Sequence, residues 1–253
     1  MSAPLRPRPH RLPLTTQLTS TLLRAPLFLA ATAAFGSASL LASLVEKDGR
    51  LQHRIAHSWA RVSMACAGSR ITVLGEPNLR ACPVAVYCSN HLSYMDTPAI
   101  FASLPFQFRI VARSNLWQVP FIGWHLNRSG QIPVNVENPR ASIASLGGGV
   151  KTLREGMPVF VFPEGGRTRD GRPGTFMNGP AFMAIRARVP LVPMALIGTY
   201  ELLPMHTKQF YPGPVLLAVG EPIDTSAYSP RDVEALTQHP ATVTADLFYR
   251  HAA

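Results

Sequence analysis

The segment Val84-Ala-Val-Tyr-Cys-Ser-Asn-His-Leu-Ser-Tyr-Met-Asp-Thr-Pro-Ala-Ile-Phe-Ala-Ser-Leu104 indicates the fold class of this chain of 253 residues. It begins with an apolar run, 84 to 88, of the length and residue types of a buried strand. A polar stretch, 90 to 96, then leads into an apolar segment, 97 to 104, that we expect to be helical. A strand, a polar turn and a helix in succession are typical of α/β proteins, which place their sites at the carboxyl ends of strands.

The same alternation continues along the chain. Further strands are predicted at 70–74, 106–111, 159–162, 192–197 and 215–219, with helices at 139–154 and 179–188. Asn138-Pro139 suits a helix start, because Asn caps and Pro fits the first helical position. Gly147, Gly148 and Gly149 each cost about 1 kcal/mol in a helix interior, so we expect that helix to be kinked or split. The predicted fold class is α/β, a mixed sheet flanked by helices.

The N-terminal region predicts a helical, membrane-associating element. A basic, Pro-rich stretch with Arg6, Arg8 and Arg11 precedes the run 25–45, which carries no charge and is long enough to cross a bilayer. The segment 51–67 interleaves apolar and basic residues and fits an amphipathic helix lying on lipid headgroups. A cleaved signal peptide or a buried helix is the alternative for 25–45, although the run exceeds the usual apolar core of a signal peptide.

Composition favours contact with a membrane or an anion. Apolar residues make up 47% of the chain and charged residues only 15%. The net charge of +10, from 24 Lys and Arg against 14 Asp and Glu, attracts anionic lipid, phosphorylated substrates or nucleic acid. A general preference for Arg in the source organism is the alternative. Cys66, Cys82 and Cys88 lack metal or redox spacing, which indicates a reducing environment facing the cytosol.

His91 and Asp96 are the first candidates for chemistry. On a regular helix they would lie about 140° apart, so they meet only if a turn follows His91 and a helix starts near Ser93. Asp96 would then fix the tautomer of the imidazole, and His91 would accept a proton from a hydroxyl group. The pattern Ser93-x-x-Asp96 is also a capping box, in which Asp96 would serve only backbone amides.

The second constellation is Phe162-Pro-Glu-Gly-Gly-Arg-Thr-Arg-Asp-Gly171, again directly after a predicted strand. Its carboxylate, flexible amides and two guanidinium groups suit a phosphorylated polyol, because Arg offers forked donors to phosphate oxygens. An ordinary Gly-rich surface turn with solvated charges is the alternative.

Four blocks in this order make the sequence resemble the family of 1-acylglycerol-3-phosphate acyltransferases. They are Asn-His-x-x-x-x-Asp at 90–96, Arg113-Ser-Asn-Leu-Trp-Gln-Val-Pro-Phe-Ile-Gly123 with Gly130-Gln-Ile-Pro-Val-Asn-Val136, Phe162-Pro-Glu-Gly-Gly-Arg167, and Val189-Pro-Leu-Val-Pro193. The resemblance covers about residues 50–223. It departs at Val136, where the family usually has Arg, and at Gly166, where it usually has Thr. Arg167, Arg169 and Arg128 are the candidates to replace the missing charge.

The resemblance implies an αβ fold with an N-terminal membrane element, no metal, no bound cofactor and no covalent intermediate. It makes His91 the general base and Asp96 its partner, with Glu164, Gly165 and Arg167 binding substrate. The fourth block is expected to shape the acyl or acceptor site. Residues 1–68 then form a basic tail, an apolar membrane helix and an amphipathic helix, and residues 69–253 form the acyltransferase catalytic domain.

The expected reaction is direct attack of a hydroxyl group on a thioester. His91 deprotonates the acceptor hydroxyl, which adds to the thioester carbonyl, and nearby donors stabilise the oxyanion. The resemblance implies lysophosphatidic acid as acceptor and acyl-CoA or acyl carrier protein as donor, with another lysophospholipid or a lyso-aminolipid as the alternative acceptor. We expect the protein to be membrane-associated, with its catalytic domain on the cytoplasmic side, and to bind a membrane surface but no nucleic acid.

Two other function classes explain the sequence less well. A serine hydrolase would need a Gly-x-Ser-x-Gly elbow, which is missing, and Ser93 has no separate His in a motif context. A non-catalytic basic protein that binds membranes or nucleic acid would account for the charge but not for His91, Asp96 and Glu164. Aromatic residues are also not interleaved with the Arg clusters, as stacking on bases requires.

Overall fold

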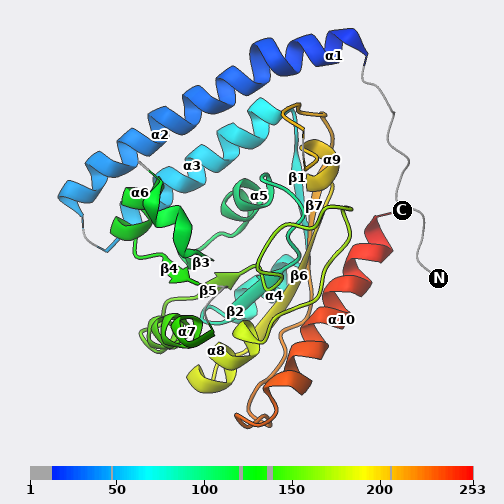
Figure 1. Cartoon of the computed structure of the whole chain (residues 1–253). Coiled ribbons are helices and arrows are strands. Elements are labelled where there is room, and N and C mark those ends of the chain that lie inside the picture. The colour runs from blue at the N-terminus through cyan, green and yellow to red at the C-terminus, as the bar shows by residue number, and fades with distance from the viewer. Residues whose placement is uncertain (1–12, 47, 120–121, 136–138, 206, 253) are drawn as a thin grey trace.

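The computed structural model describes residues 13–252, apart from 47, 120–121, 136–138 and 206. Its centre is a seven-stranded sheet with the strand order β1-β7-β6-β2-β5-β3-β4 (Figure 1). The strands are β1 (Ile71–Leu74), β2 (Val86–Ser89), β3 (Arg109–Arg113), β4 (Ile132–Val134), β5 (Val159–Val161), β6 (Leu191–Ile197) and β7 (Val215–Val219). Every neighbouring pair is parallel except β6 and β7. The predicted fold class, a mixed sheet flanked by helices, is confirmed.

Five neighbouring strands, β6, β2, β5, β3 and β4, run in the same direction. Their carboxyl ends therefore meet at one edge of the sheet, where α/β proteins usually bind ligands. This arrangement brings together chain segments that follow different strands and lie far apart in the sequence.

Helices cover both faces of the sheet, as Figure 1 shows. They are α1 (Leu14–Thr19), α2 (Ala25–Val45), α3 (Arg50–Ala67), α4 (Glu76–Ala81), α5 (Asp96–Ser103), α6 (Ile122–Arg128), α7 (Pro139–Arg154), α8 (Gly179–Ala187), α9 (Thr199–Leu202) and α10 (Val233–His251), with a π-helical turn (Ser20–Arg24) and a 3-10 turn (Ser114–Gln118). Side chains alternate between the faces along β2. Tyr87 packs in the core cluster with α3 and α5, whereas Val86 and Cys88 pack in the cluster with α7 and α8.

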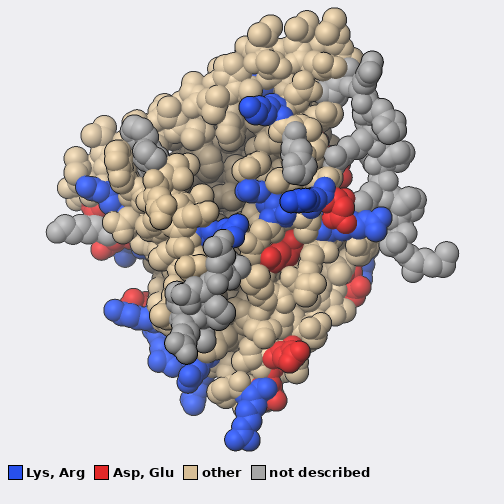
Figure 2. Space-filling view, viewed as in Figure 1, with Lys and Arg blue, Asp and Glu red and all other residues tan. Residues whose placement is uncertain are grey.

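The first 32 described helical residues, Leu14–Val45, form one helix that is long and apolar enough to cross a membrane. This helix lies along α3 on the outside of the molecule (Figure 1). Only Ser39 and Ala42 of α2 are buried. A buried core helix, which was one alternative for this run, would bury most of its residues. Figure 2 shows an almost uncharged surface over α1 and α2, whereas Lys and Arg gather lower on the same face. These features indicate membrane association, and the predicted helix at 51–67 is confirmed as α3.

Polar contacts attach the long helix to the rest of the molecule. The indole Nε1 of Trp59 donates to the Thr32 hydroxyl at 3.1 Å, and Ser39 Oγ lies 2.7 Å from Nδ1 of His125 on α6. Arg128 on α6 donates to the Ser43 hydroxyl at 2.9 Å. The α2 helix is thus fixed to two separate helices by hydrogen bonds as well as by apolar packing.

The helix predicted at 139–154 was expected to be kinked or split. It is not split, because α7 runs without interruption from Pro139 to Arg154. A Cβ atom at Gly149 would lie 2.4 Å from the sulfur of Met183 on α8, whereas Cβ atoms at Gly147 and Gly148 would meet nothing within 4 Å. The absence of a side chain at Gly149 lets α7 and α8 pack closely. This packing offsets part of the helix-propensity cost of the three glycines.

Candidate functional site

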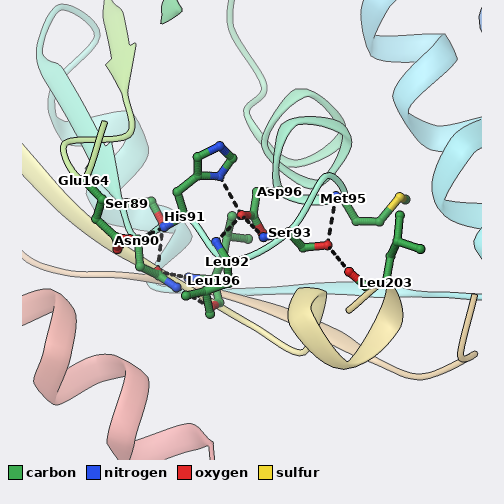
Figure 3. A network of polar contacts seen from close by, with 10 residues as sticks. All are labelled: Ser89, Asn90, His91, Leu92, Ser93, Met95, Asp96, Glu164, Leu196 and Leu203. Atoms are coloured by element: carbon green, nitrogen blue, oxygen red, sulfur yellow. Dashed lines mark hydrogen bonds and ion pairs between the residues drawn. The ribbon is translucent and has the colours of Figure 1, made fainter. Parts of the chain in front are cut away.

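The predicted contact between His91 and Asp96 is present. Nδ1 of His91 lies 2.8 Å from Oδ2 of Asp96, and the ring's other nitrogen points away from the carboxylate (Figure 3). Residues 91–95 form a non-helical turn, and α5 begins at Asp96 rather than near Ser93. The imidazole side chain is 14% exposed and the Asp96 side chain is fully buried. In the tautomer in which the Nδ1–H donates to the carboxylate, the neutral ring carries its lone pair on Nε2.

Asp96 also serves the backbone, so the capping interpretation is partly right. Its Oδ2 accepts the amides of Leu92 at 2.6 Å and Ser93 at 2.8 Å, in addition to the imidazole of His91. The Ser93 hydroxyl does not complete a capping box; it donates to the carbonyl of Leu203 and accepts the Met95 amide. Asp96 therefore fixes both the turn and the orientation of the ring.

The third block lies directly beside His91, because β2 and β5 are neighbours in the sheet. The His91 amide donates to Oε1 of Glu164 at 3.1 Å, and the Thr168 amide donates to the His91 carbonyl at 3.0 Å. The imidazole stacks on the ring of Phe162, with centroids 4.0 Å apart and an interplanar angle of 10°. Three contacts thus hold the backbone and the ring of His91 against the segment that follows β5.

Burial raises the pKa of Glu164 to about 7, and the carboxylates of Asp96 and Asp170 act in the same direction. The backbone amides of Gly174 and His91 oppose this shift. Oε2 of Glu164 is buried and accepts no hydrogen bond of good geometry from a described residue. A proton on this oxygen reduces the cost of burying the group, which is the physical cause of the raised pKa.

A cavity of about 640 Å³ opens beside His91 at the carboxyl edge of the sheet. Gly165, Arg167, Arg113 and Arg169 are among its lining residues, and none of the described lining residues is acidic. The Arg167 guanidinium lies 3.7 Å from the centroid of the Tyr94 ring, and no ion pair joins it to a described carboxylate. The cavity therefore suits an anionic group, and of the predicted substrate-binding residues Gly165 and Arg167 line it whereas Glu164 does not.

A second cavity, of about 290 Å³, lies between α2, α3, β3 and α6. Its walls are largely apolar and include Phe35, Gly36 and Trp59. Four residues line both cavities: Thr97, Ile110, Ala112 and Leu116. The larger cavity beside His91 thus adjoins an apolar cavity that reaches the long N-terminal helix.

Asn90 has a structural role that its place in the motif did not reveal. Its side chain donates to the Leu196 carbonyl at 2.9 Å and accepts the Leu196 amide at 2.8 Å. These two bonds continue the pairing of β2 with β6 past the end of β2 (Figure 3). Sequence patterns could not reveal this contact, because 106 positions separate the partners.

The second and fourth blocks differ in position. Arg113, at the end of β3, lies at the carboxyl edge and lines the larger cavity. Residues 189–193 instead enter the opposite, amino-terminal end of β6 and line neither cavity, which contradicts the expected role of the fourth block in shaping the site.

Val136 lies outside the described residues. No cluster of His, Cys, Asp or Glu within the described residues suits a metal ion, and the metal-free site stays a prediction.

The fold is shared with a solved acyltransferase structure. The crystal structure of the 1-acyl-sn-glycerophosphate (LPA) acyltransferase PlsC from Thermotoga maritima superposes with a TM-score of 0.76 at 24% identity, covering 91% of this chain and 95% of that chain. Independently, the sequence pattern of the acyltransferase family matches residues 70–197. The chain belongs to the acyltransferase family.

Curated relatives carry a more specific name. The 1-acyl-sn-glycerol-3-phosphate acyltransferase LPAT1, chloroplastic, of Arabidopsis thaliana is 34% identical over 156 residues, 61% of this chain and 43% of that protein. A 1-acyl-sn-glycerol-3-phosphate acyltransferase of Chlamydomonas reinhardtii is 33% identical over 199 residues, 76% of this chain and 59% of that protein. One from Borreliella burgdorferi is 29% identical over 150 residues, 59% of this chain and 60% of that protein. The chain spans about half the length of these relatives.

Proposed function

We propose that this protein transfers a fatty acyl group from an acyl thioester to the free hydroxyl of lysophosphatidic acid, giving phosphatidic acid. The observation that carries the proposal is the pairing of a free imidazole nitrogen with an arginine-lined cavity. Nδ1 of His91 is occupied by Asp96, so Nε2 is available to a hydroxyl group in a cavity that has no described acidic lining residue. The names of the relatives support the same acceptor.

The proposed mechanism is direct acyl transfer. Nε2 of His91 removes the hydroxyl proton as the acceptor oxygen adds to the thioester carbonyl. Collapse of the tetrahedral intermediate forms the ester and expels the carrier as a thiolate, which takes the proton from the imidazolium. Asp96 holds the ring in the required tautomer, and its negative charge faces the positive charge that the ring acquires.

The other site residues have binding and positioning roles in this proposal. Arg167 binds the acceptor phosphate with forked donors, and Gly165 gives the phosphate access to the backbone. Glu164 accepts the His91 amide and thereby fixes the third block beside the base. The smaller, apolar cavity takes the fatty acyl chain, because it adjoins the larger cavity and removes apolar surface from water.

The proposal also assigns the two parts of the chain. Residues 1–68 attach the enzyme to the membrane, on the cytoplasmic side, and residues 69–253 carry the chemistry. The almost uncharged surface of the long N-terminal helix supports this division. A membrane-attached site receives both the lysolipid and the acyl chain from the bilayer without exposing them to water.

A panel assay tests the function. The purified full chain is offered acyl-CoA or acyl carrier protein loaded with the same acyl group, against lysophosphatidic acid, other lysophospholipids and a lyso-aminolipid. Products are identified by mass. We expect phosphatidic acid as the main product with at least one carrier. Faster transfer to a phosphodiester or phosphate-free acceptor would contradict lysophosphatidic acid as the substrate and would leave the family membership intact.

A further inference from the structure

Four large apolar side chains between β3 and β4 are exposed. Leu116 lies in the 3-10 turn, Val119 directly follows that turn, and Ile122 and Trp124 belong to α6. Ile122 is 47% exposed and Trp124 is 54% exposed. A single exposed apolar residue needs no explanation, whereas several in one short segment mark an interaction site. We call these four residues the α6 surface.

The α6 surface lies next to the C-terminal half of α2 (Figure 1). His125, the residue after Trp124, places its Nδ1 2.7 Å from Ser39 Oγ on α2. On the same half of α2, Leu41 is 66% exposed and Leu44 is 70% exposed. The apolar surface of the long helix therefore has an apolar neighbour on α6.

The charge of this part of the chain suits an anionic lipid headgroup. Residues 97–136 contain no Asp or Glu, and the exposed Arg113 and Arg128 lie on either side of the α6 surface in the sequence. Arginine near a membrane surface is attracted to lipid phosphates. The indole of Trp124 has an apolar body and a polar N–H, which favours the level of the headgroups. These features fit a bilayer, whose headgroups are anionic and whose interior is apolar.

The α6 surface also borders the smaller, apolar cavity. Leu116 and Ile122 line this cavity and are exposed as well, whereas Val119 and Trp124 line neither cavity. Contact with a bilayer at this place would cover the outer side of the cavity wall and remove apolar surface from water. The bilayer would then meet the protein where the wall of the apolar cavity is thinnest in sequence terms, at the turn and the first residues of α6.

We propose that the α6 surface is a second membrane contact, which inserts into the headgroup region of the bilayer beside the long helix. The proposal goes beyond the proposed function, in which residues 1–68 attach the enzyme. Membrane affinity scales with the apolar area that is buried. Four side chains therefore orient the catalytic part of the chain on the membrane and do not replace the anchor.

Quenching of tryptophan fluorescence by brominated lipid tests the contact without turnover. The chain has 3 tryptophans, so Trp59→Phe together with Trp117→Phe leaves Trp124 as the only emitter. This variant of the full chain is reconstituted into vesicles of phosphatidylcholine and phosphatidylglycerol, with bromine on the upper acyl carbons of the phosphatidylcholine. We expect the brominated lipid to quench most of the Trp124 emission.

A reporter at the opposite edge of the sheet is the matched control. Leu74 is 42% exposed on the edge strand β1, whereas the 3-10 turn contacts β4, the other edge strand. Leu74→Trp, with all three native tryptophans changed to Phe, should give emission that brominated lipid leaves unchanged. Equal quenching at the two positions, or no quenching at Trp124, would overturn the proposal.

Thermal unfolding shows whether these variants keep the fold. Trp124→Phe alone changes only an exposed position and gives the same information by difference. Wild type should lose more emission to brominated lipid than Trp124→Phe does, and an equal loss would contradict the contact.

Kinetics on two forms of the acceptor tests the consequence for activity, and this part rests on the proposed function. Trp124→Glu should lower kcat/KM about tenfold for lysophosphatidic acid held in vesicles, because a carboxylate opposes contact with anionic headgroups. It should leave kcat/KM for a short-chain lysophosphatidic acid dispersed as monomers nearly unchanged, since Trp124 lines neither cavity. Leu74→Glu should change neither value. An equal loss on both forms would show that Trp124 does not act through the membrane.

The outcomes separate this inference from the proposed function. Quenching at Trp124 in a protein that acylates no lysolipid would leave the membrane contact standing and the proposed function wrong. A second copy of this chain is the other possible occupant, and measurement of mass in detergent checks it. If Trp124→Glu turns a dimer into a monomer and brominated lipid does not quench Trp124, the α6 surface is a subunit interface and the membrane contact is wrong.

Discussion

The two ring nitrogens of His91 have different surroundings. Nδ1 is held by the buried carboxylate of Asp96, whereas Nε2 points away from it, and the residue lines the larger cavity. The flat contact with Phe162 prevents the ring from turning away. A general base held in one orientation and one tautomer has less freedom to lose in the transition state.

His91→Ala should reduce kcat by on the order of 10²-fold or more, since the proposed general base is removed. Mass-detected product formation measures the loss, and thermal unfolding checks that the fold survives. His57→Ala is a suitable control, because His57 is another half-buried histidine but lines neither cavity. Near-normal turnover of His91→Ala would exclude the proposed mechanism.

Asp96→Asn should lower both activity and stability, because this carboxylate accepts two amides as well as the imidazole. The two effects distinguish the catalytic interpretation from the capping one. If stability falls while activity survives, Asp96 serves only the turn.

Glu164 should make the stability of the fold depend on pH. Its pKa is raised from 4.5 to about 7, so between these values the folded protein binds a proton that the unfolded chain has lost. The free energy of unfolding therefore decreases as pH rises through this window. The difference in free energy of unfolding, Glu164→Gln minus wild type, should therefore increase by on the order of 2 kcal/mol from about pH 5 to pH 8, because only the wild type loses the stabilising proton.

Thermal or denaturant unfolding at the two pH values measures the difference between variant and wild type. The comparison removes the contribution of ionisable groups distant from Glu164, because both proteins retain them unchanged. Glu155→Gln, at an exposed carboxylate, serves as the control. Identical pH dependence in wild type and Glu164→Gln would contradict the raised pKa.

At the scale of the elements, close packing of α7 and α8 depends on one of three consecutive glycines. Gly149→Ala should destabilise the protein by about 1 to 3 kcal/mol, because the new methyl group would overlap the buried side chain of Met183. Gly148→Ala, one position earlier in open space, should stabilise it by about 0.5 to 1 kcal/mol through helix propensity. Unfolding free energies of opposite sign are expected, and equal effects would contradict the packing explanation.

The apolar cavity beside α2 gives a prediction about acyl chains. A Cβ atom at Gly36 would meet nothing within 4 Å, and Gly36 lines this cavity, so Gly36→Leu fills part of it. We expect transfer of long acyl groups to fall more than transfer of short ones, measured as kcat/KM over a series of chain lengths. Ala34→Leu, an exposed position on the same helix, should leave the series unchanged. An equal loss at every length would indicate general damage and not a filled cavity.

At the scale of the whole molecule, the long N-terminal helix joins membrane attachment to the site. Deletion of residues 1–46 should move the protein to the soluble fraction, because the exposed apolar surface of this helix is lost. Some activity on dispersed substrate should remain, since His91 and Arg167 are retained. It should be reduced with long acyl groups, because α2 forms one wall of the smaller cavity.

Fractionation at low and high salt is the measurement for this deletion. High salt separates attachment by charge from attachment by apolar surface, since it screens only the former. A truncated protein that stays membrane-bound in high salt would place the anchor outside residues 1–46.

Much of the fold was predictable from local pattern. The predicted strand at 215–219 is found as β7, and the helix 139–154 coincides with α7. The three-residue strand β4 and the C-terminal helix α10 were not predicted. β4 is too short to show a period, and Pro240 interrupts the pattern of α10, whose stability comes from its packing on β6 and α8.

The sequence by itself determined the alternation of strands and helices, the apolar N-terminal run and the residues of the His91–Asp96 turn, because each depends on neighbours within a few positions. Only the tertiary structure decided that β2 and β5 are adjacent, which brings Glu164 to the amide of His91. It also decided that Tyr200 reaches the carbonyl of Arg169. Strand order has no local signal: it follows from how the two faces of the sheet are buried together, so contacts between strand ends arise only when the whole sheet has formed.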